Sequence, residues 1–159
     1  MFTASELYGL AIQVEMNGER IYRNAAGKVT RDSLREILGW LADEEMRHQG
    51  EFLKIKQKVD DQSESGRSTS GMSDDESMIL RMAMGRHAFS LDDLEAQSIP
   101  GEKELLETAI LFEEDAIQFF DFIAGFLSDA TALACIEAIR REELDHKRLL
   151  AEKLSELER

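Results

Sequence analysis

The feature that most constrains this chain is a repeat of charged residues between its two halves. Glu15, Glu45 and His48 recur as Glu113, Glu143 and His146, at an offset of 98 residues in each case. In each half a single glutamate precedes a Glu-x-x-His motif by 30 residues. Four packed helices can direct four carboxylates and two imidazoles of this kind towards two metal ions. The repeat therefore predicts a four-helix bundle with a site for two metal ions.

The repeat extends beyond these residues. Identical residues recur at the same offset in Glu6/Glu104, Leu7/Leu105, Ala11/Ala109, Ile12/Ile110, Ala26/Ala124, Gly27/Gly125 and Glu44/Glu142. Apolar residues also match in type, as Ile21 with Phe119 and Leu41 with Ile139. Each half is therefore expected to form one helical hairpin that buries its apolar face against the other. The predicted fold is all-α, with two repeated helical hairpins in one bundle.

Length and composition favour one compact domain over residues 1–159. A chain of this length buries roughly two-thirds of its unfolded surface, which is sufficient for a core without disulfide bonds. One proline, 43% hydrophobic and 33% charged residues favour a soluble helical protein over a strand-rich or disordered one. No stretch resembles a membrane span, and residues 1–10 lack the basic start and apolar run of a secretion signal. We therefore expect a cytoplasmic location.

The net charge of −14 excludes some partners. Nucleic-acid binding needs a basic surface stripe, and here the few basic residues are dispersed among acidic ones. An anionic membrane surface is disfavoured for the same reason. Part of the acidic excess belongs to the candidate metal ligands, whose charge bound cations would offset.

The first hairpin is predicted at residues 4–60, with helices at about 4–26 and 32–60. Thr3 and Glu6 have the spacing of a capping box, which favours a helix start at this point. Apolar residues then follow helical spacing as far as Gly27, a candidate helix stop. The lysines near residue 58 suit the negative end of the second helix dipole.

The second hairpin is predicted at about 100–157, after a long connection at about 61–99. The start of that connection, residues 62–77, is rich in serine, glycine and aspartate, which favours a flexible link. The last helix can be capped by Ser128 or Asp129. A connection of this length lets the second and third long helices run parallel, joined by a crossover.

The spacing within each motif explains why it can bind metal. Residues three apart lie on the same side of a helix, so Glu45 and His48 can offer an oxygen and a nitrogen to one ion. In the usual arrangement the glutamate of each Glu-x-x-His motif bridges both ions, whereas each histidine and each remaining glutamate binds one. Such mixed donors suit iron or manganese and can also hold zinc.

A single glutamate on a helix is usually a solvated residue, and one Glu-x-x-His match is common in a chain with 33 acidic residues. Two matches with equal separations, each inside an apolar stripe, are much less common. Burying four carboxylates without compensating charge costs many kcal/mol, and metal cations are the natural compensation. The two-metal interpretation is therefore favoured.

Four segments resemble a known family: AIQVEMNGERIYRNAAG, LADEEMRHQGEFLKI, AILFEEDAIQFFDFIAG and AIRREELDHKRLL. They look like the rubrerythrin branch of the ferritin-like di-iron carboxylate superfamily. The resemblance implies a ferritin-like bundle, the six ligands named above and a centre of two iron ions that reacts with oxygen or peroxide.

The sequence departs from that family in two respects. Rubrerythrins proper add a rubredoxin-like iron site with two Cys-x-x-Cys pairs, and this sequence has only Cys135. Electrons are therefore expected from an external donor protein. The family also places a carboxylate three residues after the third-helix glutamate, where this chain has Ala116, with Gly18 as its repeat mate. A peroxidase mechanism with a changing ligand set is thus placed in doubt.

Several other residues have two readings. Tyr22 lies two turns after Glu15, so its phenol could donate a proton or hydrogen bond near the metals, or be an ordinary core tyrosine. Glu19 could be an extra carboxylate, although a solvated position is favoured. Glu44 and Glu142 precede the bridging residues and are expected behind the ligands or at the surface. Cys135 is expected to be a small buried apolar residue.

These features favour an oxidoreductase with two iron ions that reduces peroxide or oxygen, or oxidises ferrous iron. Two alternatives remain: an iron-binding protein that stores, carries or senses iron, and a bundle in which metals only stabilise the helices. A homodimer through an exposed helix face is compatible with the sequence. The substrate, the electron donor, the native metal and the oligomeric state are not determined by these residues.

Overall fold

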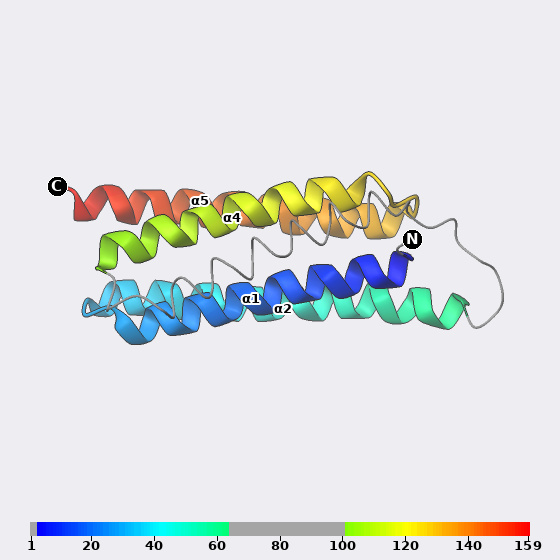
Figure 1. The fold of residues 1–159 in the computed structure, drawn as a ribbon, viewed down its shortest axis with the longest axis horizontal. Helices are drawn as coiled ribbons and strands as arrows, with labels where there is room; N and C mark the ends of the chain where they lie inside the picture. The colour runs from blue at the N-terminus through cyan, green and yellow to red at the C-terminus, as the bar shows by residue number, and fades with distance from the viewer. Residues whose placement is uncertain (1–2, 64–100) are drawn as a thin grey trace.

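The computed structural model describes residues 3–63 and 101–159, and within these ranges the chain forms helices and no strand. The helices are α1 (Ala4–Lys28), α2 (Asp32–Ser63), α4 (Glu102–Ala124) and α5 (Ala130–Leu157). They are arranged as two stacked hairpins (Figure 1), with α1 packed on α2 and α4 packed on α5. The predicted all-α class is confirmed for the described residues.

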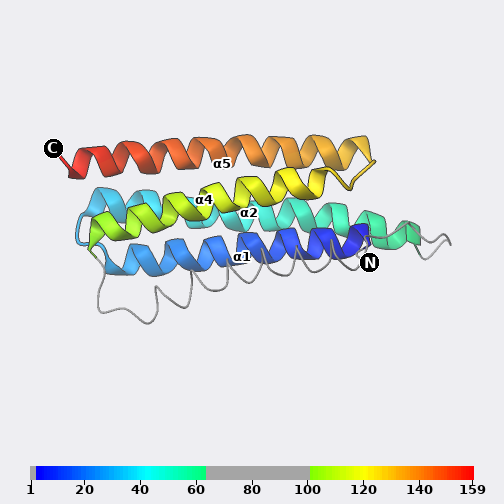
Figure 2. The same cartoon turned by 45° about the horizontal axis from the view of Figure 1, so that its top comes forward.

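Contacts between the hairpins define a four-helix bundle. α1 also contacts α4, and α2 also contacts α5. Viewed from a second direction (Figure 2), α2 and α4 run parallel, with the end of α2 and the start of α4 at opposite ends of the bundle. This agrees with the predicted crossover topology. The connection predicted at 61–99 begins later than expected, because α2 continues to Ser63, and the rest of it lies outside the described residues.

The predicted start of α1 is confirmed, whereas its predicted end is wrong. The Glu6 carboxylate accepts a hydrogen bond from the Thr3 amide at 2.7 Å, and the Thr3 hydroxyl accepts one from the Glu6 amide at 3.2 Å. At the other end Gly27 lies inside the helix, and Val29 is the capping residue. Val29 has an extended conformation, and its amide donates a hydrogen bond to the carbonyl oxygen of Ala25. The helix therefore ends without a left-handed glycine.

The second hairpin begins and turns as its sequence suggests. Glu102 and Glu104 occupy the first turn of α4, and the Asp129 carboxylate caps α5 by accepting from the Ala132 amide at 2.8 Å. Of the two predicted caps, Asp129 is the one used. Glu102 also accepts hydrogen bonds from the amides of Thr30 and Arg31 at 3.0 and 3.2 Å, which ties the first turn to the start of α4.

The interior consists of two apolar clusters with buried charged residues in addition. One cluster is centred on the aromatic residues Phe52, Phe112 and Phe120, and the other contains mainly leucines, including Leu38 and Leu106. Each fully buried side chain of this size contributes about 1.5–3 kcal/mol. Cys135, predicted to be a small buried apolar residue, packs against the edge of the first cluster but is only partly buried.

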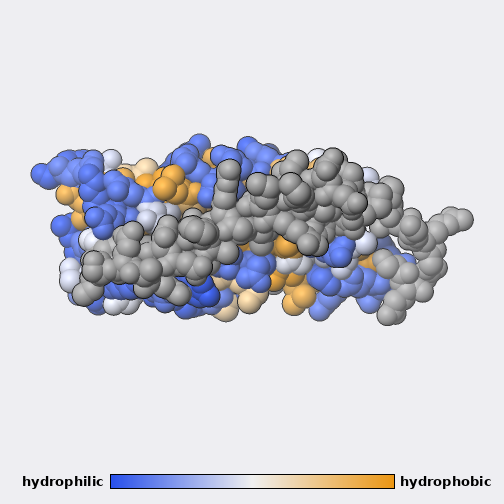
Figure 3. Space-filling view, viewed as in Figure 1, coloured by the Kyte–Doolittle hydropathy of each residue, from blue (hydrophilic) through white to orange (hydrophobic). Residues whose placement is uncertain are grey.

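Where described residues are visible in Figure 3, the surface is mostly hydrophilic, with smaller hydrophobic patches. The large apolar side chains exposed among the described residues are Met16, Trp40, Met46, Leu53, Leu111 and Phe126. None of the described helices is long and apolar enough to span a membrane.

Candidate metal centre

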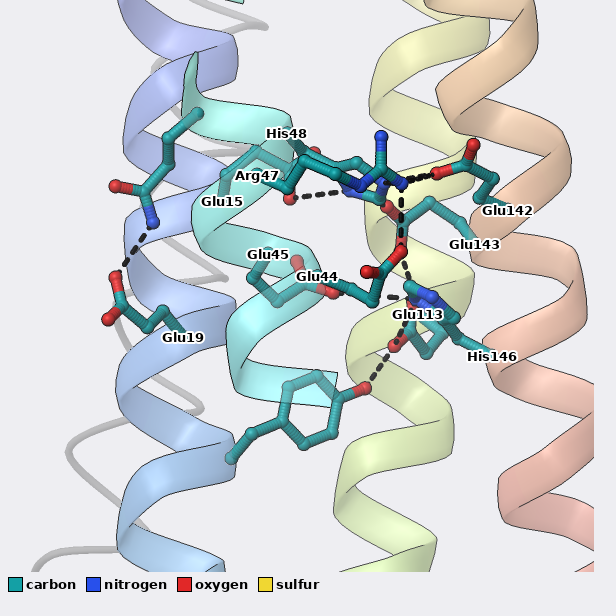
Figure 4. Close-up of polar contacts among 12 residues, drawn as sticks. Glu15, Glu19, Glu44, Glu45, Arg47, His48, Glu113, Glu142, Glu143 and His146 are labelled. Carbon is teal, nitrogen blue, oxygen red and sulfur yellow. Dashed lines mark hydrogen bonds and ion pairs between the residues drawn. The ribbon is translucent and has the colours of Figure 1, made fainter. Parts of the chain in front are cut away.

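The six residues of the repeated motifs meet in the middle of the bundle (Figure 4). They are Glu15 on α1, Glu45 and His48 on α2, Glu113 on α4, and Glu143 and His146 on α5. Each has between 0 and 2% of its surface exposed, although charged residues are rarely buried. The helical period explains the convergence, because each residue replaces an apolar one in the buried stripe of its helix.

The donor atoms form two groups that share two glutamates. One group contains Glu15, Glu45, His48 and Glu143, and the other contains Glu45, Glu113, Glu143 and His146. Within each group one donor atom from every residue lies within 4.8 Å of the others. The shared residues, Glu45 and Glu143, are the glutamates of the two Glu-x-x-His motifs. This is the geometry expected when these two bridge a pair of ions and the other four each bind one.

Both imidazole rings direct the same nitrogen, Nδ1, towards the carboxylates. His48 Nδ1 lies 2.8 Å from Glu143 Oε1 and 3.4 Å from Glu15 Oε2. His146 Nδ1 lies 3.4 Å from Glu143 Oε2 and 3.5 Å from Glu45 Oε1. Because Nδ1 of each ring faces the carboxylates, it is the ligand atom that each ring would offer. The two rings are also stacked, with their centroids 5.8 Å apart.

Most of the polar atoms in this centre make no hydrogen bond. Buried atoms without a partner occur on each of the six residues: Glu15 Oε1 and Oε2, Glu45 Oε1, His48 Nδ1, Glu113 Oε2, Glu143 Oε1 and Oε2, and His146 Nδ1. Each such atom costs roughly 1–3 kcal/mol of desolvation, and more if it is charged. Proteins rarely leave so many buried polar atoms without a hydrogen bond in one place. Metal cations satisfy all of them at once, so these residues fit a pair of metal ions.

The shifts in pKa lead to the same conclusion. Burial raises the pKa of Glu15, Glu45 and Glu113 well above the usual range of a carboxyl group, and repulsion from Glu143 adds to the effect. Burial acts in the same direction on Glu143, but its contacts with Glu113 and the two imidazoles lower its pKa overall. Without cations, the centre therefore takes up protons to reduce its negative charge.

The two imidazoles also become stronger bases. Burial alone would lower their pKa values, but contacts with Glu143 and the neighbouring carboxylates raise the pKa of His48 and of His146 to about 9. Metal binding must displace these protons, because only a neutral imidazole offers a lone pair.

Tyr22 is fully buried beside the second donor group. Its hydroxyl donates a hydrogen bond to Glu113 Oε1. Burial raises the pKa of Tyr22 well above its usual value, so the phenol stays protonated and remains a donor. Its repeat mate, Phe120, has no hydroxyl to offer. The structure therefore places the phenol next to a predicted ligand, and a catalytic role for it stays a prediction.

The other carboxylates near the centre lie behind the ligands. His48 Nε2 lies 2.7 Å from Glu142 Oε2, while Arg47 contacts both Glu44, at 2.8 Å, and Glu142. Glu44, His48 and Glu142 also form a group of potential metal donors, but the guanidinium of Arg47 already contacts both carboxylates.

Glu19 is directed away from the centre and binds Gln49 and Arg23, each at 2.9 Å (Figure 4). It does not belong to any donor group among the described residues, which favours the solvated reading over an extra ligand.

Two close approaches were not expected from the sequence. A Cβ atom at Gly18 would lie 2.6 Å from Glu45 Oε2 and 2.8 Å from the ring of Phe112, so the glycine makes room for a bridging ligand. The rings of Trp40 and His146 pack in a T-shaped arrangement, with an interplanar angle of 83° and centroids 5.5 Å apart. The only sequence signal for these contacts is that Gly18 and Trp40 differ from their repeat mates, Ala116 and Ala138.

The fold and site together define a ferritin-like bundle with a carboxylate and histidine centre. A putative ferritin-like diiron-carboxylate protein from Thermotoga maritima has the same architecture, with 26% identity, a TM-score of 0.69 and coverage of 98% of this chain and 96% of that one. A hypothetical protein from Pyrococcus furiosus shares the fold with 17% identity, a TM-score of 0.66 and coverage of 97% and 89%.

The family model of rubrerythrin matches residues 6–76, which include α2 and all but the first two residues of α1. The predicted resemblance to the rubrerythrin branch of the ferritin-like superfamily is therefore confirmed. No curated protein matches the sequence.

Proposed function

We propose that this chain is a di-iron oxidoreductase that reduces peroxide or oxygen, or oxidises ferrous iron, with electrons from an external donor. The observation that carries the proposal is the set of unpaired buried atoms on six residues from four helices. The rubrerythrin match and the diiron-carboxylate relative support iron as the metal. Manganese and zinc also suit these donors and are tested beside iron.

We infer a role for each residue from its membership of the two donor groups. Glu45 and Glu143 belong to both groups and would bridge the ions, while Glu15 and His48 would complete one position and Glu113 and His146 the other. If each carboxylate uses one oxygen per ion, each position has four protein donors, fewer than iron accepts. A ferrous pair supplies two electrons, one from each ion, which is the number that reduces hydrogen peroxide to water.

The chain's own residues control charge, water and protons around this pair. The four carboxylates offset the positive charge of two divalent cations, and their burial keeps bulk water away. The Tyr22 hydroxyl holds a proton at Glu113 Oε1, where it can be donated to a neighbouring acceptor. The single cysteine cannot form a rubredoxin-type iron site, so re-reduction requires a second molecule as donor.

The test is to load metal-free protein with ferrous iron without oxygen, count the iron and then add peroxide or oxygen. We expect two irons per chain, a ferric absorption band after oxidation, and repeated cycles when a chemical reductant is supplied. Glu143→Ala should lose this reaction. Glu36→Ala, at an exposed position on α2, is the matched control and should retain it. Two bound irons inert to both oxidants would contradict the proposal.

One observation favours a second candidate, a bundle that metals only stabilise. All six ligands are at most 2% exposed, as they would be if nothing had to reach the ions. In that case zinc and iron should raise the melting temperature alike, and the bound iron should not cycle. A single stoichiometric oxidation without recycling would instead favour iron storage or sensing.

A further inference from the structure

The outer nitrogens of the two candidate histidine ligands have different neighbours. His48 Nε2 meets the carboxylate of Glu142, which belongs to the other hairpin, at 2.7 Å. Within the described part of the chain His146 Nε2 has no such acceptor, and the His146 ring packs in a T-shaped contact with Trp40 instead. The two histidines are thus alike at Nδ1, which faces the candidate metal site, and differ in what surrounds Nε2.

The sequence explains this difference. Glu44 and Glu142 are repeat mates, but the residues three positions later are Arg47 and Asp145. Glu44 binds Arg47 on its own helix at 2.8 Å. Glu142 has a like charge at the equivalent place, and Asp145 binds Arg148. Glu142 therefore reaches across to α2, where it contacts His48 and Arg47.

An acceptor on the outer nitrogen of a histidine ligand has two consequences. It keeps the proton on Nε2, which leaves the lone pair of Nδ1 directed at the metal, and it makes the imidazole a stronger donor. Arg47 in turn limits the movement of Glu142, because it contacts both Glu142 and Glu44. The His146 ring lacks this restraint among the described residues.

We propose that Glu142 is a positioning residue that makes the Glu15 and His48 position bind its ion more tightly than the Glu113 and His146 position, so that the two ions enter in order. The inference rests on the metal centre of the proposed function and is independent of its redox activity. Losing such an outer partner usually weakens metal affinity by about 10–100-fold. The first and second dissociation constants should therefore differ by about tenfold or more.

Trp40 makes the order of filling measurable. It is the only tryptophan of the chain and it contacts His146, so a quenching ion should reduce its emission mainly from the second position. We would titrate metal-free protein with cobalt(II), following cobalt absorbance for total binding and tryptophan emission for the His146 position. In the wild type, cobalt absorbance should rise with both equivalents, whereas tryptophan emission should fall mainly with the second.

The matched variants are Glu142→Ala and Glu44→Ala, since both carboxylates contact Arg47 but only Glu142 contacts His48. Glu142→Ala should raise the first dissociation constant by about 10–100-fold and remove the lag in emission. Glu44→Ala should change it by less than about threefold, within ordinary variation for a partner that the ligand does not touch. If Glu142→Ala loses its helical circular dichroism, Glu142→Gln replaces it and should shift the constant in the same direction by less.

A second readout reports on His48 directly. Proton NMR of the one-cobalt form should show a slowly exchanging imidazole N–H signal that disappears in Glu142→Ala. Two equal equivalents, emission that falls with the first one, or variants that behave alike would overturn the inference and leave the proposed function intact. Failure to bind two ions would overturn both.

Discussion

The two hairpins supply the same candidate ligands to the centre, yet they differ at the positions just behind those residues. Gly18 corresponds to Ala116, Tyr22 to Phe120, and Arg47 to Asp145. The repeat therefore persists among the side chains that face the centre of the bundle, and it is lost at neighbouring positions that contact different residues in the two hairpins. A chain of this kind can have a symmetric ligand set and two chemically distinct metal positions.

The largest effect that we expect comes from the two candidate bridging residues. Because each hairpin contributes one of them, their substitutions should have equal effects on metal binding. Glu45→Ala and Glu143→Ala should each abolish binding of both ions, because both glutamates belong to both donor groups. Glu15→Ala and Glu113→Ala should each remove one ion. Elemental analysis of zinc-loaded protein measures this, with circular dichroism as the control for folding. One ion retained in Glu45→Ala but none in Glu143→Ala would show that bridging is unequal.

The sequence alone was sufficient to predict the fold and to predict that these six residues lie close together. The reason is that both depend on periodic signals: apolar stripes at helical spacing, the capping box at Thr3 and a repeat of constant offset. The end of α1 was missed by two residues because an extended Val29 can end a helix as well as a left-handed glycine can.

Contacts between hairpins could not be predicted in the same way. The approach of Glu142 to His48 and of Trp40 to His146 depends on how far each helix rotates against its partner. The repeat mates of Arg47 and Trp40 show only that the two halves differ at these positions. They do not show which side chain from the other hairpin fills the space.

The second prediction concerns pH, and here the two hairpins should behave alike. In the metal-free protein the pKa of both His48 and His146 is raised from 6.5 to about 9, because both face Glu143. A raised folded pKa gives stability that is present below pH 6.5 and is lost as the pH rises through about 9. The pKa values of Glu15, Glu45 and Glu113 are also raised, so these carboxyl groups likewise lower the stability of the metal-free protein as the pH rises above the usual range of a carboxyl group.

We therefore expect the free energy of unfolding of metal-free protein to fall, on the order of a few kcal/mol, between pH 6.5 and 9. Zinc-loaded protein should lack this loss, since metal replaces the protons and binds better as the ligands deprotonate. Urea unfolding at several pH values, with and without zinc, measures the difference. A metal-free protein that becomes more stable towards pH 9 would contradict the assigned pKa shifts.

The third prediction compares Gly18→Ala with Ala116→Gly. A methyl group at Gly18 would lie 2.6 Å from Glu45 Oε2, so the bridging carboxylate must move. We expect metal affinity to fall by about tenfold or more, as it does when ligand geometry is disturbed. Folding should suffer less, because alanine favours a helix by about 1 kcal/mol over glycine. Ala116→Gly should instead cost about 1 kcal/mol of stability with little change in affinity.

Calorimetric zinc titration and urea unfolding of both variants separate these two effects. Equal loss of affinity in Gly18→Ala and Ala116→Gly would mean that the difference at this repeat position has no consequence for the metals. Unchanged affinity in Gly18→Ala would mean that Glu45 can move without weakening the bridge.

The smallest effect is expected at Tyr22, the phenol that only the first hairpin provides. Tyr22→Phe leaves Glu113 Oε1 without its donor, so the metal-free protein should lose roughly 1–3 kcal/mol of stability. In zinc-loaded protein the loss should be smaller, because a cation then also compensates the charge of Glu113. The measurement is a double-mutant cycle of Tyr22→Phe with Glu113→Gln in urea, at unchanged m value. A coupling energy near zero in the metal-free protein would mean that the phenol is an ordinary core side chain. A coupling that survives metal loading undiminished would mean that Tyr22 orients Glu113 as a ligand, which makes the position served by α4 dependent on a residue of α1.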